Sequence, residues 1–363
     1  MRLSLFKVHL PPRDELMPKL EEVLYSGQIG EGELVKQFES AFGQFIGNPN
    51  TLSFSSGTAA LHTALLLAGV RPGDEVISTP MTAEPTNMAI MHAEAKLVWA
   101  DVDPCNGNLS PEAIRDKITD RTKAVLVVHY AGIPASLHRI RAVTEARGVP
   151  LIEDAAHALG ACYNGKPIGN HSEYVMFSFQ AIKHLTTVDG GMLTCMRESD
   201  LPAGRRIRWF GIDRAQPRTK VDVNEVGYKY HMNNVTAAIG LVQLASIRTV
   251  IQRHMDNGSF YDRNLSNVPG LQICQHDREA LPAHWIYTVL TDRRDDLAKH
   301  LTACGIECSQ VHRRNDRHPV FAGSRCDLPG LDSYYDRMLH IPCGWWVTEE
   351  DREYVVDCIR RGW

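Results

Sequence analysis

The stretch FSFQAIKHLTTVDGG, residues 177–191, places Lys183 between an apolar run and a pair of glycines. A single lysine in a soluble protein is nearly always an exposed charge. Here it follows a segment typical of a buried strand, and Gly190-Gly191 allows close backbone approach beside it. A partly desolvated lysine loses its charge and becomes a nucleophile toward aldehydes. The stretch therefore raises two alternatives for Lys183, a surface charge or a residue that forms a Schiff base.

The surrounding sequence predicts an α/β fold. From residue 51 to about 195, short apolar runs alternate with longer amphipathic segments, the pattern of a parallel or mixed sheet covered by helices. Helical patterns include residues 58–70 and 136–148, and the second ends at Gly148, a suitable C-cap. The expected strands begin at residues 51, 75, 96, 123, 150, 174 and 191.

The second half of the chain predicts a smaller domain. A long helical pattern runs from about residue 233 to 256, and the sequence after it is more polar with shorter strands. We expect a large domain over residues 1–245 and a smaller C-terminal α+β domain over residues 246–363. The first 25 or so residues could pack on the smaller domain. A capping-box-like Thr348 predicts a terminal helix.

Composition bounds the possible partners. The 363 residues carry a formal charge of −4 and no polybasic run, which argues against nucleic acid and charged membranes as partners. The N-terminal apolar run is too short for a secretory signal, and no segment approaches ~18 uninterrupted apolar residues, so we expect a cytoplasmic protein. The nine cysteines are scattered, which favours reduced thiols, and Cys304 and Cys308 lack the second ligand pair of a metal site.

Two further features stand at the ends of expected strands. Gly57 and Thr58 open a helix rich in alanine and leucine, where free backbone N–H groups can hold a phosphate, although an ordinary N-cap is the alternative. Asp154 ends the apolar strand PLIED, at the sheet edge where ligands bind. It could equally cap a following helix. With Lys183, these features match pyridoxal 5'-phosphate (PLP), whose phosphate, ring nitrogen and aldehyde need an N–H cradle, a carboxylate and an amine.

The ordered blocks SSGTAAL, GDEVISTP, PLIEDAAHALGA, FSFQAIKHLTTVDGG and GYKYHMNNVTAAIGLVQL together resemble the DegT/DnrJ/EryC1/StrS family of sugar aminotransferases. These are fold-type I PLP enzymes that act on nucleotide-linked keto sugars. The resemblance runs from residue 26 to near the C-terminus. It implies a large PLP-binding domain with a mixed, mostly parallel sheet and a homodimer whose active site is shared between subunits.

The resemblance also assigns roles to residues. It implies that Lys183 binds the cofactor covalently and moves a proton, that Asp154 pairs with the ring nitrogen, and that His157 approaches the ring's 3-hydroxyl. Further residues implied to hold the phosphate are Gly57, Thr58, Ser178 and, from the neighbouring subunit, Lys229.

Two positions depart from the family pattern. Lys229 stands where many members have asparagine, and a lysine can still pair with a phosphate. Ala83 stands where an aromatic residue usually stacks on the cofactor ring, so Met81 or another side chain would cover that face, or the site would be more open with Glu84 near the substrate.

The expected reaction is transfer of the amino group of L-glutamate to a keto carbon, with C4 preferred, of a nucleotide-linked deoxysugar. The product would be an amino sugar for a polysaccharide or a glycosylated natural product. Alternatives are a 3-keto sugar, a keto-cyclitol, or a PLP-binding regulator without turnover; the intact Lys183 argues against the last and against the family's dehydratases, which have histidine there. Further substrate candidates are Trp209, His312 and Arg313.

Overall fold

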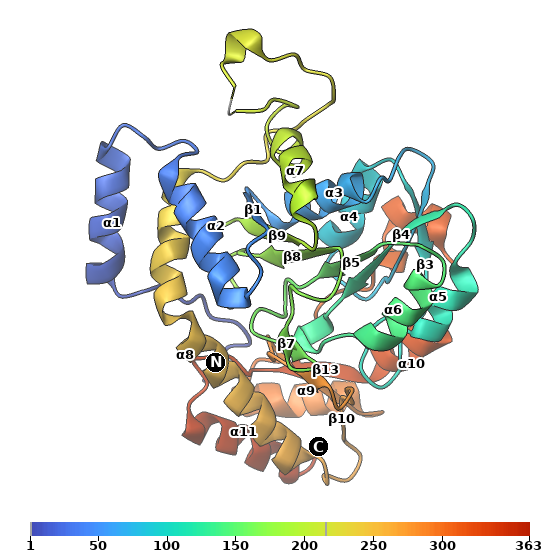
Figure 1. The fold of residues 1–363 in the computed structure, drawn as a ribbon. Helices are drawn as coiled ribbons and strands as arrows, with labels where there is room; N and C mark the ends of the chain where they lie inside the picture. The colour runs from blue at the N-terminus through green and yellow to red at the C-terminus, as the bar shows by residue number, and fades with distance from the viewer. Residues whose placement is uncertain (1, 215) are drawn as a thin grey trace.

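The computed structural model describes residues 2–214 and 216–363, and its centre is a seven-stranded sheet (Figure 1). The strand order is β1-β9-β8-β5-β4-β2-β3, and only β9 runs antiparallel to its neighbours among the described strands of this sheet. All seven predicted strands are confirmed, and so is the α/β class with a mixed, mostly parallel sheet. Their bounds are β1 Thr51–Phe54, β2 Glu75–Ser78, β3 Lys96–Trp99, β4 Thr122–Val128, β5 Leu151–Asp154, β8 Tyr174–Ser178 and β9 Gly191–Cys195.

Helices cover both faces of this sheet, and each face has its own apolar core. Such two-sided cover explains why the parallel strands are continuous apolar runs rather than alternating ones. One core packs against α3 (Gly57–Leu67), α4 (Glu84–His92), α7 (Leu201–Ile207) and α10 (Pro329–Arg337). The other packs against α2 (Glu33–Ile46), α5 (Pro111–Lys117), α6 (Leu137–Glu145) and the first part of α8 (Asn234–Leu265).

Glycines have different roles in two of the predicted helices. Gly148 lies beyond α6 with φ of 63°, and the bonds from Val149 N–H to Thr144 O and from Gly148 N–H to Glu145 O form a Schellman motif, which confirms the predicted cap. By contrast, α8 continues nine residues past the predicted end. Gly258 lies inside this helix, and it serves close packing, because a Cβ there would lie 2.2 Å from the His284 ring.

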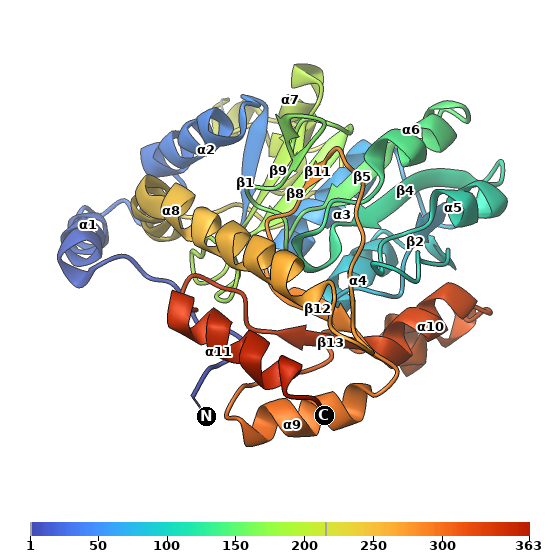
Figure 2. The ribbon, with the colours of Figure 1, turned by 90° about the horizontal axis from the view of Figure 1, so that it is seen from below.

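The C-terminal part forms a second layered unit, with both termini beside α9 and α11 (Figure 2). A three-stranded sheet, β10-β12-β13, packs with the end of α8, α9 and α11 around a third apolar core. The predicted capping box at Thr348 starts α11. Leu3 pairs with Ile306, so the N-terminus joins this unit. The bounds are β10 Gln272–Ile273, β12 Tyr287–Leu290, β13 Met338–Ile341, α9 Arg294–Ala303 and α11 Glu349–Arg360.

The remaining described elements are short or peripheral. They are α1 (Arg13–Tyr25), the small sheet of β6 (Cys162–Tyr163), β7 (Lys166–Pro167) and β11 (Ala280–Leu281), and the 3-10 helices Tyr130–Gly132, Glu198–Asp200, Arg218–Lys220, Asn315–Arg317 and Pro319–Ser324. The domain boundary predicted at residue 245 falls inside the continuous helix α8 and stays a prediction.

Helix α8 is also the one described helix long and apolar enough to cross a membrane by length and composition. Half of its most apolar window is buried inside the protein, where it packs against α2 and the central sheet. Core helices of soluble proteins have the same composition, so the feature is weak evidence for a membrane span.

Candidate active site

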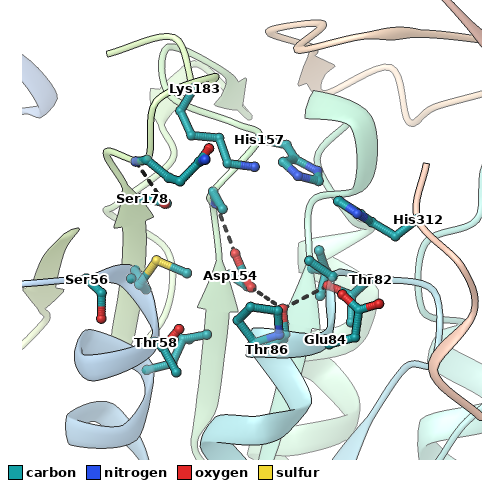
Figure 3. A pocket seen from close by; sticks show the side chains of 18 of the residues that line it. Ser56, Thr58, Thr82, Glu84, Thr86, Asp154, His157, Ser178, Lys183 and His312 are labelled. Atoms are coloured by element: carbon teal, nitrogen blue, oxygen red, sulfur yellow. Dashed lines mark hydrogen bonds between the residues drawn. The ribbon is translucent and has the colours of Figure 1, made fainter. Parts of the chain in front are cut away.

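A cavity of about 430 Å³ opens at the carboxyl ends of β4, β5 and β8, beside the start of α3 (Figure 3). Ligands of open α/β sheets bind at this edge. The structure brings together eight of the residues predicted from sequence around this cavity: Gly57, Thr58, Glu84, Asp154, His157, Ser178, Lys183 and His312.

The start of α3 forms a cradle of N–H groups at one end of the cavity. Ser56 is the N-cap, and its hydroxyl oxygen accepts a bond from Ala59 N–H at 3.1 Å, which confirms the N-cap alternative; phosphate binding here stays a prediction. Gly57 and Thr58 follow, and their N–H groups have no preceding turn to bond. A Cβ on Gly57 would lie 3.0 Å from Met176 Sδ and 3.3 Å from Ser178 Cβ, so glycine keeps the cradle open.

Asp154 lies buried at the end of β5, with both carboxylate oxygens bonded. The Thr86 hydroxyl donates at 2.7 Å and the Ala156 N–H at 3.0 Å, while Thr82 lies 2.8 Å from Thr86 (Figure 3). Since no helix begins here, the N-cap alternative is wrong. Burial raises the pKa of Asp154, and these two bonds and the charge of Lys183 oppose that rise. Neither Thr82 nor Thr86 was predicted from the sequence. Thr82 lies in the loop before α4 and Thr86 in the first turn of that helix, so no strand end marked them.

Lys183 points its amine into the same cavity (Figure 3). Burial lowers the pKa of this amine to about 7, against the attraction of Asp154. Nζ lies 3.9 Å from the ring centroid of Trp285. A large fraction of the amine is therefore neutral near physiological pH, which is the state a nucleophile needs. No local sequence signal identified Trp285, which follows Lys183 by more than a hundred residues.

Two neutral histidines line the cavity beside this lysine. The centroid of the His157 ring lies 3.9 Å from that of Trp285, on which it stacks. The centroid of the His312 ring lies 5.8 Å from that of His157. Burial, aided by the charge of Lys183, holds the pKa of His157 well below its ordinary value and lowers the pKa of His312 to about 4. His157 Nδ1 and His312 Nε2 are buried without a partner among the described residues, so each can bond a ligand.

The end of the cavity opposite the N–H cradle contains Ala83, the residue that departs from the family's aromatic position. Ala83 and Glu84 line it, and Glu84 Oε1 lies 3.1 Å from His318 Nε2. Of the alternatives for the ring face, coverage by Met81 is wrong, because Met81 is fully buried in the core against the α3 face of the sheet, and the described lining does not include it. The other two stay open.

Three predicted residues lie outside the cavity of one chain. Lys229 is exposed, and its backbone pairs with that of Trp209. The Trp209 ring packs edge-on against His231 at 4.1 Å, and Arg313 is exposed with Nη2 3.5 Å from Arg317 O. Their contacts with substrate or cofactor stay predictions.

The cavity fits PLP on three independent observations. The glycine-dependent N–H cradle suits a phosphate, the buried Asp154 suits a cationic ring nitrogen, and the unpartnered His157 Nδ1 suits the ring hydroxyl. Lys183 supplies the amine. Across residues 2–214 and 216–363, no group of three or more His, Cys, Asp or Glu side chains could hold a metal ion.

Comparison with known proteins agrees with this geometry. Residues 12–360 match the model of the DegT/DnrJ/EryC1/StrS aminotransferase family. The crystal structure of the sugar aminotransferase CalS13 from Micromonospora echinospora is 40% identical with a TM-score of 0.95, covering 99% of both chains. AtS13 from Actinomadura melliaura is 41% identical with the same TM-score, covering 99% of this chain and 98% of its own. The spore coat polysaccharide biosynthesis protein SpsC of Bacillus subtilis is 31% identical over 95% of this chain and 94% of its own. The chain therefore belongs to the DegT/DnrJ/EryC1/StrS family and is a PLP-dependent sugar aminotransferase.

Proposed function

We propose that this enzyme moves the amino group of L-glutamate to the C4 keto carbon of a nucleotide-linked deoxysugar. The observation that carries the proposal is the amine of Lys183, buried opposite Asp154 in a cavity whose far end is lined with hydrogen-bonding groups. Glutamate would leave as 2-oxoglutarate, and the keto oxygen as water. The product would be an amino sugar for a polysaccharide or a glycosylated natural product, made in the cytoplasm.

We assign a role to each polar group at the cofactor end of the cavity. Bound PLP withdraws electrons from the substrate carbon and stores the amino group between the two half-reactions. The N–H groups of Gly57 and Thr58 and the hydroxyl of Ser178 hold the phosphate. The Ser178 oxygen already accepts a bond from Gln180 N–H at 3.3 Å, so its hydrogen is free to be donated. Asp154 holds the proton of the ring nitrogen, and His157 bonds the ring hydroxyl.

Lys183 both binds the cofactor and moves protons. Its amine, with a pKa of about 7, can accept or donate a proton near neutral pH. Nζ takes the proton from Cα of glutamate in the first half-reaction and delivers a proton to the keto carbon in the second.

The charges of the ligands favour a site shared between two copies of the chain. Among the described residues that line the cavity, Lys183 is the only lysine or arginine. The phosphate and the two carboxylates of glutamate need more positive charge than that. The exposed Lys229, in the segment that resembles the family's intersubunit block, would supply it from the second subunit of a homodimer.

The sugar end of the cavity offers polar side chains. Glu84 has a carboxylate oxygen not engaged with His318, and His312 has a free ring nitrogen. These groups suit sugar hydroxyls, which donate and accept hydrogen bonds. Ala83 in place of an aromatic residue leaves more room at this end for a substituted sugar ring.

The test uses purified enzyme, PLP and matched panels of donors and acceptors. We expect 2-oxoglutarate from L-glutamate, faster than oxo acids from L-alanine or L-aspartate, and an aminated 4-keto nucleotide sugar. Preferred amination of a 3-keto sugar or a keto-cyclitol would reject the C4 assignment. Equal use of the free sugar would reject the nucleotide linkage. PLP binding without transfer to any acceptor would favour the regulator.

The shared site has its own test in mixed subunits. Lys183→Ala and Lys229→Ala homodimers should each be impaired, the first in turnover and the second in PLP affinity. After subunit exchange, mixed dimers contain one intact site, so activity should rise. Absence of any recovery, with exchange verified by mass spectrometry, would show that Lys229 does not act across the interface.

A further inference from the structure

We propose that Trp285 is a positioning residue for Lys183, fixing the lysine at both its backbone and its amine. Trp285 lies between β11 and β12, is 1% exposed, and comes from the C-terminal half of the chain. The inference rests on the proposed role of Lys183 as the lysine that binds PLP.

Two contacts from the one indole ring reach the lysine. Trp285 Nε1 donates to the carbonyl of Ile182 at 2.8 Å, across 103 residues of sequence. That carbonyl belongs to the peptide bond between Ile182 and Lys183, so this hydrogen bond fixes the backbone position of Lys183. The ring centroid lies 3.9 Å from Lys183 Nζ, so the ring also restrains the position of the amine.

The ring is itself held in place from other elements. His157 stacks on it with a centroid distance of 3.9 Å and an interplanar angle of 12°. Phe6, from the N-terminal segment, packs at 4.9 Å. With the carbonyl of Ile182, the buried indole thus has three partners from separate parts of the chain, and its position is well defined.

An aromatic face suits a lysine that must react. A carboxylate at this distance would hold the amine as a charged ion pair, whereas a ring attracts the cation more weakly and accepts no conventional hydrogen bond. No side-chain hydrogen bond joins Lys183 Nζ to another residue in the described part of the chain, and burial lowers the pKa of the amine to about 7. Trp285 therefore restrains the amine while leaving it able to lose its proton.

The groups that face Lys183 set the direction of the expected change. Asp154 favours the charged form of the Lys183 amine, whereas burial favours the neutral form. The rings of His157 and His312 are themselves neutral, because their pKa values are lowered. The Trp285 face also favours the charged form. Removing that face while keeping an apolar side chain should therefore lower the pKa of Lys183 further.

The experiment measures Lys183 directly in cofactor-free, full-length protein. Trace acetylation with acetic anhydride at a series of pH values, followed by peptide mass spectrometry, gives the midpoint at which Lys183 becomes reactive. We expect Trp285→Leu to lower this midpoint by on the order of one pH unit. Trp285→Phe keeps a ring face, so its midpoint should stay nearer that of the wild type. An unchanged or raised midpoint in Trp285→Leu would overturn the proposal.

A second readout tests the contact with the backbone. The rate at which added PLP is captured, followed by absorbance, should fall several-fold in Trp285→Phe, because Phe cannot donate to Ile182 O. Unchanged capture would remove that part of the proposal. Should Trp285→Leu not fold, Trp285→Met, which also has an apolar side chain without a ring face, takes its place, and the same fall in the midpoint is expected; Trp285→Phe tests the backbone contact alone. Trp345→Phe is the matched control, since Trp345 faces Lys7 Nζ at 5.4 Å, and it should change neither readout.

The same labelling separates this inference from the proposed function. If Lys183 binds PLP, added PLP protects it from acetylation in the wild type. Absence of protection there would reject the role of Lys183, whereas protection with an unchanged midpoint in Trp285→Leu would reject only the role of Trp285.

Discussion

The two ends of the cavity differ in how their polar groups are held. At the cofactor end, Asp154 is 3% exposed and receives two hydrogen bonds, and the cradle at Gly57 consists of backbone. At the sugar end, the Glu84 side chain is 40% exposed and pairs with His318, whose side chain is 24% exposed. The polar groups of one end are backbone N–H groups and a buried carboxylate, whereas those of the other are partly exposed side chains.

This difference separates chemistry from choice of substrate. On the proposed assignment, the groups fixed by the backbone and by burial hold the cofactor and therefore act on every substrate. Exposed side chains can change without disturbing the sheet, so they are suited to select among sugars. We therefore expect substitutions at the cofactor end to reduce turnover of all substrates, and substitutions at the sugar end to change mainly the affinity for one.

The largest effect is expected for Lys183→Ala. Without the amine there is neither covalent capture nor proton transfer, so amino transfer from glutamate should fall by about 10⁴-fold. The measurement is 2-oxoglutarate release with PLP supplied, with the exposed Lys166→Ala as control. Turnover within tenfold of the wild type would place the chemistry elsewhere.

Asp154→Asn should follow, with turnover reduced on the order of 10²–10³-fold. The amide keeps the shape: its oxygen can accept from Ala156 N–H, and its NH2 group can donate to the Thr86 hydroxyl, which then donates to Thr82. It lacks the negative charge that holds a proton on the cofactor ring. The measurement is kcat at saturating PLP, compared with Asp120→Asn at an exposed position. Folding should be preserved, since a buried charge is removed. Unchanged kcat would remove Asp154 from the chemistry.

The pH dependence of PLP capture should follow the Lys183 amine. Because burial lowers its pKa to about 7 from the ordinary 10.5, the neutral and reactive amine predominates above that pH. Capture should slow about tenfold for each pH unit below the midpoint and level off above it. Stopped-flow absorbance of cofactor-free protein gives the profile. A rate that keeps rising toward the pKa of an exposed lysine would contradict the buried geometry.

Gly57→Ala should weaken PLP binding by about tenfold. The added Cβ would lie 3.0 Å from Met176 Sδ, so the cradle must shift at a cost of roughly 1–3 kcal/mol. Equilibrium PLP titration measures the loss, and thermal unfolding measures the strain. Gly323→Ala, where a Cβ meets nothing within 4 Å, is the control. Unaltered affinity would show that the phosphate lies elsewhere.

The same contrast explains what could be predicted from the sequence. Asp154 ends β5, and Gly57 and Lys183 follow β1 and β8 within five residues. Because the carboxyl ends of parallel strands meet at one edge of the sheet, local patterns place these residues together. The central strands were predictable for the same reason, being continuous apolar runs. The extension of α8 was not, because Gly258 is explained only by the ring of His284 that packs on it.

Residues that act through tertiary contacts gave no local signal. Trp285 meets Ile182 across 103 residues, and Asn315, beside the sugar end, bonds Thr82 O across 233. Lys229 and Trp209 lie outside the cavity of one chain, so neither the sequence pattern nor the structure of a single subunit tests their roles. The family resemblance showed that Ala83 replaces an aromatic residue. It could not show which other side chains take the place of that ring, because this depends on how distant segments pack.

The smallest effect is expected for Glu84→Gln. The change keeps the size of the side chain and removes one charge that is 40% exposed, so solvent already screens much of its interaction with His318. Losing a charged acceptor for a sugar hydroxyl should raise KM for the sugar only a few-fold, because such bonds contribute roughly 1.5–3 kcal/mol when buried and less when exposed. Neither PLP affinity nor the glutamate half-reaction should change. Steady-state kinetics with the sugar varied, against Glu350→Gln at a remote exposed site, measures the effect. A loss of PLP affinity or a slower glutamate half-reaction would mean that Glu84 belongs to the cofactor end, and that the two ends of the cavity are not independent.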